Sequence, residues 1–156
     1  MAAAIVLLFT TGACIPAIRN TVTDFVIHIY ETHAHYGFKG NTKDTITTEY
    51  RLDPIPEGFV ETDVFKSGEA LIERTYEDEN GNQIILTQSK TNGTGITIDR
   101  ENGYATTLTI DDISIEIYTV KNYSQAVWVF DNYVFILSYY GQIDIKDLSE
   151  LVKCVH

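Results

Sequence analysis

The sequence predicts an α+β fold, in which a curved antiparallel β-meander of about seven to nine strands packs against two helices. One helix is N-terminal and amphipathic, and the other is short and C-terminal. Three features of the chain support this class. Apolar residues recur every third or fourth position before residue 40 and every second position after residue 42, and Asn-Gly dipeptides separate the alternating stretches. The first period is typical of a helix and the second of a strand.

Residues 1–18 contain no charged side chain and open with an apolar run. We interpret them as a membrane segment, either an anchor or a truncated transmembrane helix, because a full span takes about 20 apolar residues. A signal peptide would begin with Lys or Arg. No such basic residue is present here, which suggests that Met1 lies inside a longer protein. Thr11-Gly12-Ala13-Cys14 also resembles a bacterial lipobox, so lipidation of Cys14 is an alternative anchor. An ordinary buried helix is a third interpretation.

Residues 19–40 are predicted to form an amphipathic connecting helix. Pro16 suits the first turn of a helix, and Gly37 and Gly40 are suited to end it. Its apolar face would carry Ile18, Val22, Phe25, Val26, Ile29, Tyr30 and Tyr36.

Residues 41–156 are predicted to form one acidic antiparallel sheet domain. The alternation begins with a strand over residues 42–52 and continues with strands over 59–65 and 70–76. The dipeptides Asn80-Gly81, Asn92-Gly93 and Asn102-Gly103 each lie between β-prone runs. Asn and Gly tolerate the positive φ of a type I′ turn, so each dipeptide predicts a hairpin.

Residues 126–130 and 133–137 are apolar at successive positions, which predicts central strands covered on both faces. Asp131-Asn132 would form the turn between them. Asp144 can cap a closing helix, which we expect to pack on the sheet. The apolar residues of that helix are Ile145, Leu148, Leu151, Val152 and Val155.

The stretch from Tyr50 to Phe59, YRLDPIPEGF, is followed by the meander, then by Ala126-Val127-Trp128, Tyr133 and a short closing helix. In this combination the chain resembles the bacterial DUF4367 family over residues 45–155. The segment before it, with Pro16-Ala17-Ile18-Arg19, is similar to the region that precedes this domain in single-pass membrane proteins, some of them anti-sigma-like. The resemblance implies an extracytoplasmic domain of undefined biochemical role and supplies no catalytic residues.

The net charge of −11 comes from 22 acidic and 11 basic residues, with no basic run anywhere. Phosphate binding requires clustered Lys and Arg, so nucleic acid is not an expected partner. The same excess of acid repels anionic lipid headgroups. We therefore expect the body to stand off the membrane and to be attached to it through residues 1–18.

No catalytic motif is recognisable, so we expect no enzyme and no cofactor. His28, His33 and His35 lie close in sequence but lack the spacing of metal ligands, and no metal site is predicted. The acids of 77–81 do not follow the calcium-loop pattern and are interpreted as a solvated hairpin tip. Asp111 and Asp112, as neighbours on a strand, would point to opposite faces.

Aromatic residues near the C-terminus suggest a surface for a ligand or partner, although tyrosines that simply cover a half-buried sheet are the simpler interpretation. The candidate residues are Trp128, Tyr133, Phe135, Tyr139 and Tyr140.

The function predicted from these features is that of a non-enzymatic, extracytoplasmic domain of a bacterial membrane-anchored protein. It would sense a condition or bind a protein partner, with a link to regulation. The alternative is a lipid or lipoprotein carrier that holds an apolar ligand between sheet and helices. A carrier should contain an open apolar cavity, whereas a sensor should have a filled core.

Overall fold

The computed structural model describes residues 24–29, 33–39, 42–94, 96–99 and 103–156. Within these ranges the chain forms strands β1 to β10 and the helix α1. The membrane segment expected at residues 1–18 lies outside the described residues. Among the helical residues that are described, no stretch has the length and apolar character needed to cross a bilayer.

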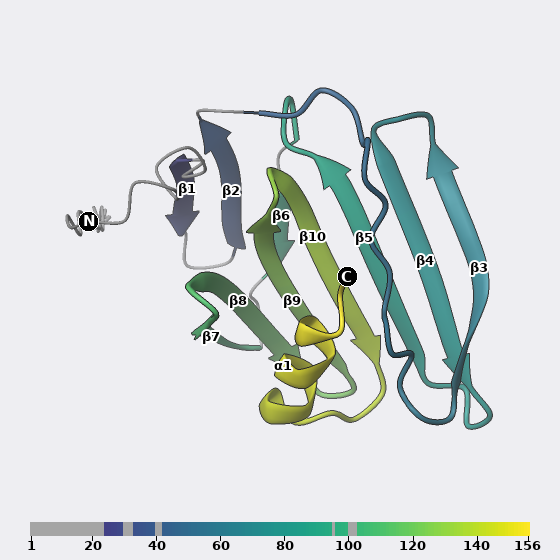
Figure 1. Cartoon of the computed structure of the whole chain (residues 1–156). Helices are drawn as coiled ribbons and strands as arrows, with labels where there is room; N and C mark the ends of the chain where they lie inside the picture. The colour runs from purple at the N-terminus through teal and green to yellow at the C-terminus, as the bar shows by residue number, and fades with distance from the viewer. Residues whose placement is uncertain (1–23, 30–32, 40–41, 95, 100–102) are drawn as a thin grey trace.

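A seven-stranded antiparallel sheet forms the body of the molecule, in the order β3-β4-β5-β10-β9-β8-β7 (Figure 1). All neighbouring strands run antiparallel, which confirms the predicted sheet type. The strands are β3 (Phe59–Ser67), β4 (Leu71–Asp78), β5 (Gln83–Lys90), β7 (Tyr104–Ile110), β8 (Ile113–Val120), β9 (Tyr123–Phe130) and β10 (Tyr133–Tyr140).

The sheet consists of two meanders rather than the single one that the sequence predicted. Strands β3 to β5 form one meander and β7 to β10 the other, and β5 joins them by pairing with β10. Asn92-Gly93 is therefore not a hairpin turn, because β5 pairs with β4 and β10 and the next strand, β6 (Ile96–Asp99), pairs elsewhere. Asn102-Gly103 leads from β6 into β7 of a different sheet, and Asn102 lies outside the described residues.

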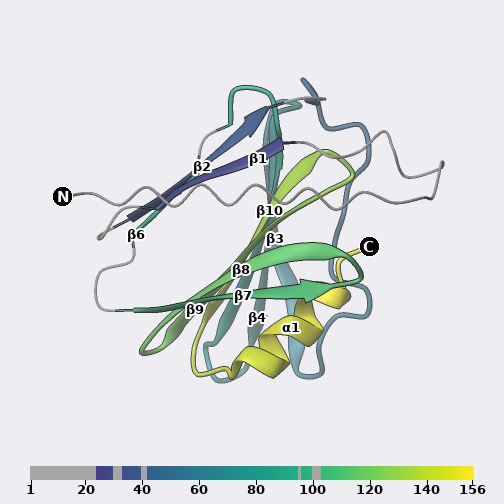
Figure 2. The ribbon, with the colours of Figure 1, turned by 90° about the vertical axis from the view of Figure 1, so that its left-hand side faces the viewer.

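A separate three-stranded sheet has the order β1-β2-β6, with β1 at Asp24–Ile29 and β2 at His33–Lys39 (Figure 2). These strands occupy part of the range for which the sequence predicted a connecting helix, residues 19–40. Residues 25–27 are Phe, Val and Ile, and aromatic and β-branched residues favour strands. The remainder of that range lies outside the described residues, where the helix stays a prediction.

Two of the predicted hairpin turns are confirmed. Asn80-Gly81 lies in the turn between β4 and β5, where Gly81 has φ +81°. Asp131 and Asn132 join β9 to β10 with φ values of +47° and +59°. Positive φ at both central residues matches the right-handed twist of the flanking strands, which is why such turns close hairpins.

A third turn of this kind was not predicted. Asp111 and Asp112 have φ values of +48° and +65° and connect β7 to β8. Their expected placement as neighbours on a strand is therefore wrong. The short polar side chain of Asp tolerates left-handed backbone, so an Asp-Asp pair serves where Asn-Gly is more usual.

Residues 42–53 cross one face of the large sheet as an extended segment that we call the strap. The sequence predicted a strand over residues 42–52, but within the strap only Leu52 forms a β-bridge, with Val155. Backbone bonds join the strap to the C-terminus at Arg51 and Asp53: the Arg51 amide donates to the His156 carbonyl at 3.0 Å, and the Asp53 amide to that of Cys154 at 2.7 Å.

Helix α1 (Ile145–Lys153) covers the same face, as predicted (Figure 1). Asp144 caps it by accepting a hydrogen bond from the Asp147 amide at 2.7 Å. Leu148 and Val152 are buried against the sheet. The strap, the helix and the inner face of the sheet enclose the main core, which comprises Leu52, Tyr76, Ile84, Leu86, Ile115, Ile117, Ala126, Trp128, Tyr133, Phe135, Leu137, Leu148, Val152 and Val155.

The opposite face of β8, β9 and β10 carries a second, smaller apolar cluster. Tyr118, Val127 and Val134 are buried there. This burial confirms that the central strands are covered on both faces.

Candidate functional site

The five aromatic candidates do not share one surface. Trp128, Tyr133 and Phe135 are buried in the main core, where the Trp128 and Phe135 rings stack with centroids 5.3 Å apart. Tyr139 is half-buried at the end of β10 on the same face. Tyr140 is exposed and packs against Tyr123 rather than with the others.

Tyr133 has a polar function as well as a packing one. Its hydroxyl oxygen accepts hydrogen bonds from the amides of Thr47 and Thr48, at 2.9 and 3.3 Å, and so attaches the strap to the sheet. The Lys43 ammonium lies 3.9 Å from the centre of the ring and pairs with Asp131 at 2.9 Å. The site thus concentrates donors around one phenol oxygen.

This arrangement changes the acidity of the phenol. Burial by itself raises the pKa of Tyr133, but the hydrogen bonds from Thr47 and Thr48 and the nearby Lys43 ammonium outweigh it. The pKa of Tyr133 is lowered to about 8. Burial instead raises the pKa of Tyr76, whose hydroxyl accepts from the Leu52 amide at 3.2 Å.

Arg74 of β4 holds the next part of the strap. Its Nε donates to the Tyr50 carbonyl at 3.2 Å, and its terminal nitrogens pair with Glu49 at 3.0 Å and Glu61 at 3.2 Å. Lys66 also pairs with Glu49, at 2.6 Å, and this hydrogen bond is the main reason that the pKa of the Glu49 carboxyl is lowered. The carboxylates of Glu49 and Glu61 are thus paired with basic side chains of the same domain.

A hollow of about 250 Å³ opens where the strap ends. The floor and walls come from four parts of the chain: the turn before β3, the inner face of the sheet, the loop after β10 and the first turns of α1. Apolar side chains form its walls, and polar atoms contribute about as much of its surface as apolar ones. The lining residues are Pro56, Phe59, Ile84, Tyr139, Gln142, Ile143, Asp144, Asp147 and Leu151.

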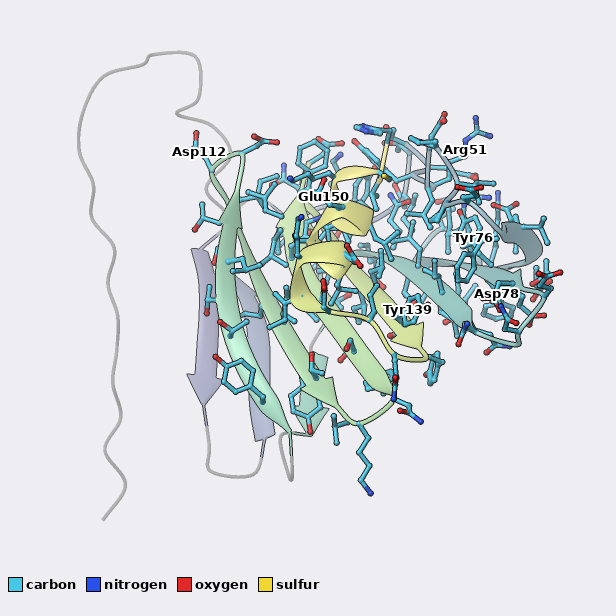
Figure 3. The ribbon with its side chains drawn as sticks, turned by 90° about the horizontal axis from the view of Figure 1, so that it is seen from below. Arg51, Tyr76, Asp78, Asp112, Tyr139 and Glu150 are labelled. Carbon is cyan, nitrogen blue, oxygen red and sulfur yellow. The ribbon has the colours of Figure 1, made fainter. Side chains whose placement is uncertain are left out.

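The rim of the hollow is acidic. Asp144 and Asp147 are exposed on its helix side, and neither forms a salt bridge with any residue in the described ranges. Asp78 lies at the same end of the sheet (Figure 3). Burial raises the pKa of the Tyr139 phenol, and the negative charge of Asp78 raises it further. No Lys or Arg is among the lining residues.

Strand β3 adjoins the hollow through Phe59, which begins the strand and packs against Tyr139 with ring centroids 6.2 Å apart. As the first strand in the sheet order, β3 has a neighbour on one side only among the described strands. All of its residues after Phe59 are exposed, including Val60 at 61%, Val64 at 36% and Phe65 at 55%. A register shift between Glu61 and Asp63 interrupts its pairing with β4.

Of the residues that form this surface, only Tyr139 was predicted as a binding residue from the sequence; Asp144 and Leu151 were predicted as parts of the closing helix and its cap. Phe59 was predicted only as the start of a strand, and Pro56 appeared only within the stretch YRLDPIPEGF. Val60 and Phe65 lie among acids in a nine-residue strand, and that mixture could have indicated an exposed edge. The hollow itself had no local signal, because its walls are far apart in sequence.

The other clusters considered earlier have structural explanations or lie beyond the described side chains. Asp78 accepts hydrogen bonds from the amides of Asn80 and Asn82, at 2.9 and 2.8 Å, and so holds the turn at the hairpin tip. The side chains of the three histidines before residue 40 are outside the described part. The described residues contain no group of His, Cys, Asp and Glu able to hold a metal ion.

These features define an α+β domain in which a strap and one helix cover one face of an open antiparallel sheet. Among the described strands β3 is an exposed edge, and it shares Phe59 with the hollow. The family model described as "Domain of unknown function (DUF4367)" matches residues 49–155, and the chain belongs to this family. The match begins in the strap and ends at Val155, which forms the bridge with it. Neither the curated proteins nor the solved structures gave a match.

Proposed function

We propose that this chain is an extracytoplasmic, non-enzymatic domain of a bacterial membrane-anchored protein, and that it binds a protein partner in a process linked to regulation. The apolar, uncharged residues 1–18 support an anchor, and the acidic body supports a domain that stands off the lipid surface. The proposal that it binds a partner is supported by the exposed edge of β3.

An unpaired strand edge presents free backbone donors and acceptors to any extended chain that approaches it. On β3 the apolar side chains of Val64 and Phe65 stand in the regular stretch after the register shift, one on each face of the sheet. Side chains of an added strand would therefore find apolar contacts on both faces. Backbone pairing supplies affinity in such complexes, and these side-chain contacts supply specificity.

A second copy of the chain is a poor partner for this edge. β3 runs from Phe59 to Ser67, so its midpoint is Asp63. Two copies paired antiparallel about that midpoint would set Asp63 against Asp63, and like charges directly opposite destabilise a strand pair. The register that pairs the whole strand is thus unfavourable between two copies, and we propose a different polypeptide as the partner.

The proposal is tested by site-specific crosslinking in intact cells of the native host. Phe65 is replaced by the photoreactive residue p-benzoylphenylalanine, and Tyr104 on β7, at the other end of the sheet and 64% exposed, is replaced in a control. We expect a discrete protein adduct from position 65, weaker or absent from position 104. Protease added outside the cells should cleave the 42–156 body. Equal adducts from both edges, or a body protected from protease, would contradict the proposal.

The alternative function, a carrier of an apolar ligand, is favoured by the apolar walls of the hollow. Its volume of about 250 Å³ is below the roughly 300–1,000 Å³ of pockets for drug-sized ligands. Trp128 and Phe135, where the sequence suggested a ligand, are stacked and buried. Titration with a fluorescent fatty acid tests the carrier: a saturable rise in the emission of the fatty acid itself supports it, and unchanged emission contradicts it.

A further inference from the structure

We propose that the hollow beside β3 receives the side chain of a lysine or arginine from the partner polypeptide. This inference rests on the proposed function, because it assigns the chemistry of the segment that the β3 edge would bind. It commits to a basic, extended segment as the occupant of the surface.

The lining matches the two-part character of such a side chain. Lys and Arg have a long apolar stem and a charged end, and they bury the stem along apolar surface while the charge stays near water or an acid. Here Phe59, Ile143 and Leu151 supply apolar wall, and Asp144 and Asp147 stand on the exposed rim. A hollow of about 250 Å³ suits one side chain better than a separate organic ligand.

Charge selects the sign of the occupant. The rim acids have no salt-bridge partner in the described part of the chain, whereas Glu49 and Glu61 on the neighbouring strap and strand are paired with Arg74. The carboxylates of Asp144 and Asp147 would therefore attract an incoming cation. The net charge of −11 adds a long-range attraction for a basic segment and repels an acidic one.

The position of the hollow links it to the edge. Phe59 belongs to both, since it is the first residue of β3 and a wall of the hollow. The rest of the hollow lies toward the interior of the sheet, with Ile84 on β5 and Tyr139 on β10, so the Phe59 end of a segment paired along β3 would be the end nearer to it. In this proposal a long basic side chain at that end extends across Phe59 toward the rim acids while the rest of the segment pairs with the strand.

The test uses side-chain mimics and the whole chain. n-Butylguanidinium is titrated into 15N-labelled protein at low ionic strength, with n-butanol as the neutral mimic. We expect saturable shifts of the Ile143, Asp147 and Leu151 amides with the cation and much weaker shifts with the alcohol. Asp147→Asn should weaken the cation by about threefold, as expected for one partly exposed ion pair.

Two further variants control for effects on the fold. Asp144→Ser removes a rim charge but keeps an N-cap residue, so binding should weaken while α1 remains intact. Asp112→Asn removes an acid at the far side of the molecule from Tyr139 and should leave the affinity unchanged (Figure 3).

The outcomes separate this inference from the proposed function. If the cation shifts none of the hollow amides, or binds Asp147→Asn and Asp144→Ser as tightly as it binds the wild type, the hollow assignment is overturned even when the crosslink at position 65 forms. If the hollow binds the cation but position 65 gives no adduct, the partner-binding function fails and a partner side chain is no longer the occupant.

Discussion

Tyr133 shows how much of this fold depends on single polar atoms inside an apolar core. The residue is fully buried, yet its hydroxyl serves the strap amides of Thr47 and Thr48. Within the described residues, every buried side-chain nitrogen and oxygen has a hydrogen-bond partner. Removal of one such partner leaves the other group desolvated and unpaired, which costs more than the bond contributes.

Tyr133→Phe should lower the free energy of unfolding by about 1–3 kcal/mol, because it leaves two strap amides without their acceptor. The ring and its packing remain, so any loss reports on the hydroxyl. Chemical denaturation measures the change. Tyr104→Phe is the control: that side chain is exposed, and we expect a change within about 0.5 kcal/mol. Equal effects of the two substitutions would show that the strap bonds contribute nothing measurable.

The lowered pKa of Tyr133 predicts a pH dependence with a definite sign. Its folded-state pKa of about 8 is below the unfolded value near 10, so between these values the unfolded chain holds a proton that the folded chain has released. This contribution to stability is complete above pH 10 and is lost as the pH falls through 8. The wild-type advantage over Tyr133→Phe should therefore grow by on the order of 2 kcal/mol from pH 7 to pH 10.

Phenolate absorbance measures the same ionisation directly. In the folded protein we expect a step near pH 8 that Tyr133→Phe removes. Tyr50, Tyr76 and Tyr139 have raised pKa values, mainly through burial, and should ionise later. A step near pH 8 that persists in the variant would assign it to another tyrosine.

At the scale of elements, the strap explains where sequence patterns succeed and where they fail. Ile46, Tyr50 and Leu52 do face the core, whereas Glu49 and Arg51 are exposed, so the alternation of residues 42–52 was a correct indication of extended backbone. Alternation says nothing about the hydrogen-bond partner of that backbone. Here the partners include side chains such as Gln88, which accepts from the Tyr50 amide at 3.0 Å, and backbone carbonyls at the C-terminus, and no periodicity encodes them.

Arg74→Lys should destabilise the protein by about 1–3 kcal/mol, because a single ammonium cannot replace the planar donors that reach the Tyr50 carbonyl, Glu49 and Glu61 together. Arg51→Lys provides a matched control. That side chain is exposed and its pair with Asp53 spans 3.7 Å, so the cost should stay below about 0.5 kcal/mol. Thermal melts of both variants at equal pH and salt compare them; similar melting temperatures would show that Arg74 does not hold the strap.

Turns and strand pairing differ in what the sequence reveals. The turn at Asp131-Asn132 was predictable because it is local: two residues with the right backbone tolerance join strands that pair with each other. The prediction of a hairpin at Asn92-Gly93 was wrong, because residues that tolerate positive φ also suit a turn between strands that do not pair with each other. Which strand becomes the neighbour of β5 depends on β10, more than 40 residues away.

At the scale of the whole molecule, long-range pairings close the domain. β10 joins the two meanders, and the bridge between Leu52 and Val155 ties the strap to the C-terminal end of the chain. The hollow exists only when these connections form, since its residues come from both halves of the chain. The fold class and the closing helix were predictable because they depend on local patterns. The candidate site was not, because its residues come together only through long-range contacts.

The bridge between strap and C-terminus should act as one cooperative unit. Leu52 is 1% exposed and Val155 9%, so Leu52→Ala should cost about 2–5 kcal/mol and Val155→Ala somewhat less. Because the residues are paired, the double variant should lose less than the sum, by at least about 0.5 kcal/mol. Leu52→Ala combined with Ile117→Ala, a core residue of the far meander, is the comparison and should be closer to additive. Additive losses at both pairs in urea denaturation would mean that the strap and the C-terminus are held independently by the sheet, and that the bridge does not couple the two ends of the family domain.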